Sequence, residues 1–92
     1  MSNLIINYQD RDLDFQIKGK EEVSGQGLKD LISHISSNDK IDKIEINGGS
    51  GSYTFSRQVY LLVNLLSSLN ECPVYVNGTK QQEDKIVIPS YN

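Results

Sequence analysis

The chain has 92 residues, with 12 acidic side chains against 9 basic ones and a formal net charge of −3. This length allows one domain over residues 1–92 with a single hydrophobic core. The acidic balance argues against nucleic acid as a partner, because phosphate binding needs clustered Lys and Arg. No apolar run approaches the ~20 residues of a membrane span, and a single cysteine is typical of a cytoplasmic protein.

The first two apolar segments predict a β-hairpin. Residues 4–8 form a short apolar run, and residues 9–12 are polar and turn-like. Leu13, Phe15 and Ile17 then alternate with polar residues. This period of two indicates a strand with one face in water.

The next segment predicts a helix. Residues 24–27 (Ser-Gly-Gln-Gly) interrupt the strand pattern, and Ser24 is the candidate helix cap. The residues that follow at helical spacing on one face are Leu28, Leu31, Ile32 and Ile35. Polar residues 36–39 then end the helix, because their side chains compete for backbone hydrogen bonds.

A third strand covers residues 41–46, and a long apolar helix is expected at about 54–70. The predicted core stripe of this helix consists of Phe55, Val59, Leu62, Leu66 and Leu69. The residues that widen its apolar arc are Tyr60, Leu61, Val63 and Leu65. A helix this apolar is covered on more than one side, by the sheet and by either the first helix or another chain.

Residues 74–76 and 86–88 predict two more strands, with a turn at 77–78, so the element order is β-β-α-β-α-β-β. Right-handed crossovers should place strands 13–17, 41–46 and 74–76 parallel, with both helices on one sheet face. The alternating strands leave the other face polar. The fold class is therefore α/β, a two-layer sandwich with a mixed sheet and two helices on one face.

A glycine-rich loop between the third strand and the long helix is the candidate ligand site. Its residues are Asn47, Gly48, Gly49, Ser50, Gly51 and Ser52. Backbone amides and the positive end of the helix dipole converge at such a position, so a phosphate, a carboxylate or a nucleotide would fit. The loop lacks the lysine of a P-loop and the spacing of a dinucleotide site. A plain connection capped by Ser52 or Thr54 is the other interpretation.

Residues 44–50 (Ile-Glu-Ile-Asn-Gly-Gly-Ser), an apolar helix and residues 73–78 (Pro-Val-Tyr-Val-Asn-Gly) resemble the core unit of the ClpP/crotonase superfamily. Residues 15–19 resemble that family's first strand. The resemblance implies that Gly48 and Gly49 donate backbone N–H groups to an oxyanion, but the helix that carries the nucleophile is missing after residue 78.

The same strand-loop-helix order also resembles STAS domains. In that family a switch serine occupies the helix start, where Ser50 or Ser52 lies here. The Asp-Ser-Ser-Gly pattern of that family does not occur in this sequence.

The chain offers no nucleophile with a base beside it, so we predict no catalytic residues, no metal site and no cofactor. His34 lies off the apolar stripe of its helix, and Cys72 follows Glu71, which raises rather than lowers a thiol pKa. One His and one Cys exclude a Cys/His metal site. The acidic residues that resemble a cation loop, without the rest of an EF-hand, are Asp10, Asp12 and Asp14.

Candidate interface residues lie on the open sheet face and on the long helix. Tyr75 should point away from the helices, near Lys43 and Glu45. Tyr60 lies on the long helix, which has apolar residues on more than one side. The favoured function is a non-catalytic protein-interaction module that acts as a regulator, an inhibitor or an oligomeric subunit. Its partner is a protein, or a second copy bound through helix 54–70.

Two alternatives remain beside this function: an anion- or nucleotide-binding domain that uses loop 47–52, and a degenerate ClpP/crotonase-like hydrolase. The sequence is rich in Ile, Asn and Lys and has no alanine, which is typical of AT-rich bacterial or phage genomes. This composition suggests an accessory protein of phage type.

Overall fold

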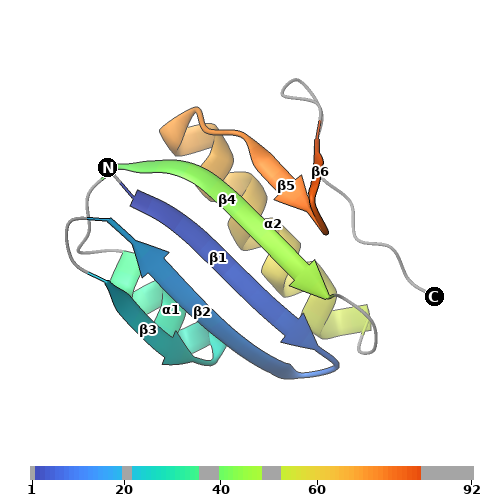
Figure 1. Cartoon of the computed structure of the whole chain (residues 1–92). Coiled ribbons are helices and arrows are strands. Elements are labelled where there is room, and N and C mark those ends of the chain that lie inside the picture. The colour runs from blue at the N-terminus through green and yellow to red at the C-terminus, as the bar shows by residue number, and fades with distance from the viewer. Residues whose placement is uncertain (1, 20–21, 36–39, 49–52, 82–92) are drawn as a thin grey trace.

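The computed structural model describes residues 2–19, 22–35, 40–48 and 53–81. The elements in these ranges are β1 (Ser2–Gln9), β2 (Asp12–Lys18), β3 (Val23–Gln26), α1 (Leu28–Ile35), β4 (Ile41–Gly48), α2 (Tyr53–Asn70), β5 (Val74–Val76) and β6 (Thr79–Lys80) (Figure 1). The strands form one mixed sheet in the order β3-β2-β1-β4-β5-β6. The sheet is one layer and the helices are the other, which confirms the predicted two-layer α/β sandwich.

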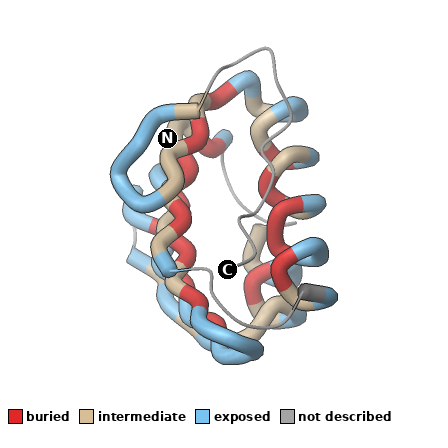
Figure 2. The backbone as a smooth tube through the Cα atoms, turned by 90° about the vertical axis from the view of Figure 1, so that its right-hand side faces the viewer, coloured by how far each residue is buried: buried red, intermediate tan, exposed pale blue. Residues whose placement is uncertain are grey.

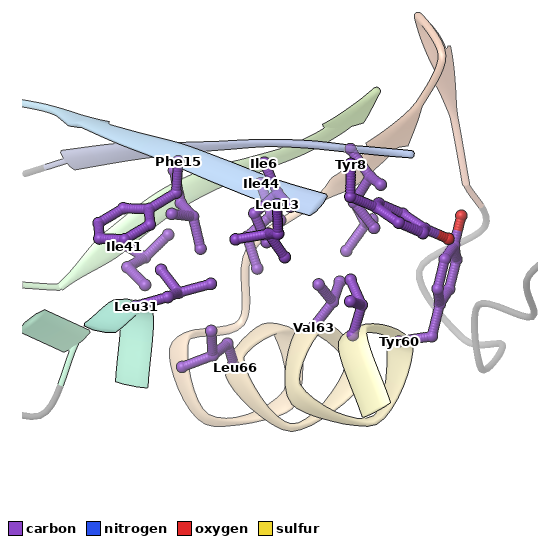
Figure 3. Close-up of a cluster of buried hydrophobic side chains, with 14 of the residues drawn as sticks. Ile6, Tyr8, Leu13, Phe15, Leu31, Ile41, Ile44, Tyr60, Val63 and Leu66 are labelled. Carbon is purple, nitrogen blue, oxygen red and sulfur yellow. The ribbon is translucent and has the colours of Figure 1, made fainter. Parts of the chain in front are cut away.

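The core lies between the sheet and the two helices. Leu13, Phe15 and Ile17 of β2 are buried, while the residues between them are exposed, as their alternation predicts. Leu31 of α1 and Val63 of α2 point toward the same sheet face (Figure 3). Figure 2 shows the buried stretches of the sheet and of α2 facing each other. Both helices therefore cover one face of the sheet, and the other face carries the polar side chains.

Residues 24–26 of the predicted helix start belong to a strand, so the prediction that Ser24 caps the helix was wrong. This strand, β3, pairs antiparallel with β2, and its Gly25 lies opposite Phe15. A Cβ atom at Gly25 would clash with the Asp30 carboxylate of α1 and lie 2.8 Å from the Phe15 ring, so these two groups occupy the space that a side chain would need. The chain turns at Gly27, with φ of 89°, and α1 begins at Leu28. Ser24 therefore belongs to a strand and caps no helix.

The prediction that strands 13–17, 41–46 and 74–76 run parallel was wrong for the first of them. β4 pairs parallel with β1 and with β5, whereas β2 runs antiparallel to β1. The physical reason is the additional strand β3, which reverses the chain once more before α1 returns it to the sheet. β1 consequently occupies the centre, where its Ile6 pairs with Ile46 of β4.

The chain after β5 turns at Asn77 and Gly78, which have φ angles of 50° and 86°. Two successive left-handed residues are the geometry of a tight hairpin turn, and β6 follows at once, antiparallel to β5. The predicted strand at residues 86–88 lies outside the described residues. Within the part of the chain that is described, no helix has the length and apolar character needed to cross a bilayer.

Candidate functional site

Helix α2 packs one side against the sheet. Val59, Tyr60, Val63 and Leu66 are each no more than 5% exposed. The Tyr60 ring meets the Tyr8 ring edge-on, with their centroids 6.5 Å apart (Figure 3). The prediction of Tyr60 as an interface residue is corrected by this contact, because its ring is part of the core.

The opposite side of α2 carries a row of exposed leucines. Leu61, Leu65 and Leu69 are 67%, 55% and 72% exposed, and we call these three residues the leucine face. They are spaced four apart, so they follow one another along the helix surface. Leu69 was predicted to belong to the core stripe, together with Leu66. The structure buries Leu66 but leaves Leu69 exposed. Arg57, four residues before Leu61, is the single charged residue of the helix.

Hydrogen bonds fix the carboxyl end of α2 against the sheet. The Asn70 side chain accepts the Ile41 N–H at 3.1 Å and donates to the Leu66 carbonyl at 2.9 Å. The Ser67 hydroxyl donates a hydrogen bond to the Cys72 carbonyl at 2.7 Å, and the Cys72 N–H donates to the Ser67 carbonyl at 3.2 Å. The helix that carries the leucine face is therefore fixed at its carboxyl end to the first residue of β4.

Cys72 is a buried free thiol at the end of this helix. Burial raises the pKa of the thiol, and a smaller contribution from Asp42 acts in the same direction. The thiolate is the nucleophilic form of cysteine, so a raised pKa makes Cys72 a poor nucleophile. The direction of this shift is the one expected from the sequence, but its main cause is burial rather than Glu71.

The structure brings Lys43, Glu45 and Tyr75 together on the open sheet face. Lys43 Nζ lies 2.9 Å from the Glu45 carboxylate and 4.5 Å from the centroid of the Tyr75 ring. The hydrogen bond to Glu45 raises the pKa of Lys43. These groups largely satisfy one another, and an exposed ion pair of this kind contributes little stability.

The first two residues of the predicted ligand loop make contacts within the chain. The Asn47 side chain donates to Asn7 Oδ1 at 3.0 Å. The Gly48 N–H donates to Asn77 Oδ1 at 2.9 Å, so this amide, which the ClpP/crotonase resemblance assigns to an oxyanion, already has a partner. The remaining predicted ligand-binding residues, Gly49, Ser50, Gly51 and Ser52, lie outside the described residues.

An open depression of about 650 Å³ lies at the carboxyl ends of β1 and β4, beside Asn47 and Gly48. The hairpin turn contributes Arg11 to its lining, but Asp12 and Asp14 line it as well. Two carboxylates against one guanidinium do not favour an anion. Among the residues that the structure describes, no group of His, Cys, Asp and Glu is placed to hold a metal ion.

The single histidine belongs to the packing of α1 on the sheet. His34 Nδ1 lies 3.0 Å from the Asp30 carbonyl oxygen, one helical turn earlier. Its ring centroid lies 5.6 Å from that of Phe15 in β2. His34 is therefore placed by a core contact that its position off the apolar stripe did not predict.

Neither a protein-family model nor a curated protein matches this sequence. The fold is similar to that of YeaZ from Pseudomonas aeruginosa, with a TM-score of 0.61 and 16% identity over 83% of this chain and 44% of that one. It is equally similar (TM-score 0.61, 16% identity) to an uncharacterised protein with similarity to the peptidase YeaZ from Pseudomonas aeruginosa, over 82% of this chain and 42% of that one.

The chain thus spans less than half the length of these two proteins. At this identity the likeness shows the fold alone. The resemblances to ClpP/crotonase and to STAS domains find no support in these two structures.

Proposed function

We propose that this chain is a non-catalytic protein-interaction module and that its contact surface is the leucine face of α2. The observation that carries the proposal is the row of Leu61, Leu65 and Leu69, each more than half exposed on a helix with one charged residue. Single exposed leucines are normal on protein surfaces, but a contiguous apolar row is typical of an interaction site. Burying one leucine fully contributes about 1.5–3 kcal/mol, so this row can supply most of a modest binding energy.

The rigidity of the surface supports the same function. The opposite side of α2 is packed into the core through Val59, Val63 and Leu66, and Asn70 bonds its end to β4. A partner therefore meets a surface that is already ordered, and little conformational entropy is lost at the helix backbone on binding. The complementary partner presents an apolar helix or groove of similar length.

The other candidate sites show fewer features that favour binding of a partner. Lys43, Glu45 and Tyr75 form a surface cluster whose charges are paired with each other. In the depression beside Gly48, the Gly48 N–H already donates to Asn77, and the carboxylates of Asp12 and Asp14 oppose an anion. We therefore place the interaction site on α2.

The test is site-specific photo-crosslinking in cells of the native host. A photoreactive residue replaces Leu65 on the leucine face, and the matched control replaces Gln16, which is exposed on the opposite face of the sheet. We expect a discrete protein adduct from position 65 and none from position 16. The substitution Leu61→Lys, combined with the probe at 65, should remove the adduct. The same adducts from both positions, or none from position 65, would contradict the proposal.

A further inference from the structure

We infer that a second copy of this chain covers the leucine face, with the two α2 helices packed antiparallel about a two-fold axis. This inference rests on the proposed function and names the partner. Its basis is the distribution of charge around the leucine face: Arg57 lies at one end of the row, and Glu71 follows the helix at the other end. Both residues are exposed.

The spacing of these residues is self-complementary. Arg57 and Asn70, the last residue of α2, are thirteen positions apart, about 20 Å at the rise of an α-helix, and Glu71 follows directly with φ of 53°. Leu65 lies close to the midpoint of that span. When two such helices pack antiparallel, Leu65 meets Leu65 of the second copy at the axis and Leu61 approaches its Leu69. Arg57 then faces the second copy's Glu71 at each end, so one symmetric contact forms both ion pairs.

The uncompensated ends of α2 favour the same orientation. The described helix has no acidic residue in its first turn and no basic residue in its last turn, so its own side chains leave the helix dipole unbalanced. An antiparallel neighbour places the negative end of one helix beside the positive end of the other. A parallel pair would instead place Arg57 against Arg57 and like helix ends together.

The size of the row sets the expected affinity. Three leucines from each copy, with a shallow crossing angle between the helices, bury less surface than a standard protein interface. The favourable burial is therefore only modestly larger than the cost of association. We expect a reversible dimer with a dissociation constant in the micromolar range or weaker.

The experiment uses the full chain in analytical ultracentrifugation, at concentrations from about 10 µM to about 1 mM. The wild type should shift from monomer to dimer over this range. Arg57→Glu and Glu71→Arg each replace two opposite-charge contacts by like-charge ones and should weaken the dimer about tenfold. An equimolar mixture of the two variants should recover a dimer. In the mixed pair, one copy carries carboxylates at both positions and the other carries guanidinium groups at both, so opposite charges meet at each end.

The matched controls are Lys18→Glu and Glu22→Arg, which make the same changes in net charge at exposed positions away from α2. They should leave the dimer unchanged, both alone and in mixture. Unfolding in urea checks that Arg57→Glu and Glu71→Arg still fold.

Three outcomes overturn the inference: a wild type that stays monomeric at the highest concentration, variants that dimerise like the wild type, or a mixture that does not recover. The proposed function has a separate outcome, because a crosslink from position 65 to a different protein would retain it while excluding the second copy. The absence of both the dimer and the crosslink would contradict both proposals.

Discussion

Asn77 holds the end of β4 with both atoms of its side-chain amide. Its Oδ1 accepts the Gly48 N–H at 2.9 Å, and its Nδ2 donates to the Gly48 carbonyl at 3.2 Å. The Asn77 backbone N–H adds a bond to the Ile46 carbonyl at 2.8 Å. The turn after β5 thereby completes the hydrogen bonding at the carboxyl end of its neighbouring strand.

We expect Asn77→Ala to lower the free energy of unfolding by about 1–2 kcal/mol, because it removes both side-chain bonds and places alanine at a φ of 50°. Urea denaturation measures the change. Asn77→Gly keeps the backbone geometry and loses only the side chain, so it should cost less than alanine. An alanine variant as stable as the wild type would show that these bonds carry no stability.

Gly25→Ala should cost about 1–3 kcal/mol, because its Cβ would lie 2.8 Å from the Phe15 ring and would also displace the Asp30 carboxylate. The comparison variant is Gly27→Ala, where a Cβ has open space and only the φ of 89° opposes it. In a Phe15→Leu background, Gly25→Ala should lower the free energy of unfolding by less than it does in the wild type. Purely additive effects in this double-mutant cycle, measured by thermal and urea unfolding, would contradict the steric explanation.

The thiol of Cys72 should react with Ellman's reagent far more slowly in the folded chain than in urea, at about pH 8, because the group is buried. Burial also raises its pKa above the ordinary value of 9.0. The folded protein then holds this proton more tightly than the unfolded chain, so stability present below pH 9.0 is lost as the pH rises from there through the folded pKa.

Cys72→Ala provides the control for this pH dependence. Its stability should fall less steeply above pH 9.0 than that of the wild type, since the titrating group is gone. Equal slopes for the two proteins in alkaline urea titrations would exclude a contribution from Cys72.

The same substitution should have very different effects on stability at two neighbouring leucines of α2. Leu65→Lys changes a side chain that is 55% exposed and should alter monomer stability by no more than about 0.5 kcal/mol. Leu66→Lys places an ammonium group at a position that is 5% exposed and should prevent folding or cost more than about 3 kcal/mol. Circular dichroism during urea unfolding separates the two, and similar losses at both positions would mean that the leucine face is not exposed.

The sequence predicts the elements whose local pattern matches their burial. Leu13, Phe15 and Ile17 alternate because one face of β2 is exposed to water, and the long helix has a largely apolar run over residues 59–66. It does not predict β3, because Ser24 and Gly25 are poor strand formers. Gly25 pairs with Phe15 of β2, and the Phe15 ring and the Asp30 carboxylate fill the space beside it, which only the tertiary structure shows.

The candidate site was predicted only in part, for a related reason. In a helix with apolar residues all round, spacing alone does not decide which side meets the sheet. Tyr60 is buried because Tyr8 lies opposite it, and Leu69 is exposed because Leu66 and Val63 already fill the core side. Those contacts depend on tertiary packing, which periodicity does not record.

The central position of β1 has a consequence for how the chain reaches its fold. Its partner β2 follows after a two-residue turn, but its other partner, β4, pairs Ile46 with Ile6, forty positions earlier. The hairpin can form early, whereas the backbone N–H and C=O groups on the other edge of β1 have no strand partner until β4 arrives. Closing such a distant pair costs chain entropy before its contacts are gained, so formation of the β1–β4 pair should limit the folding rate.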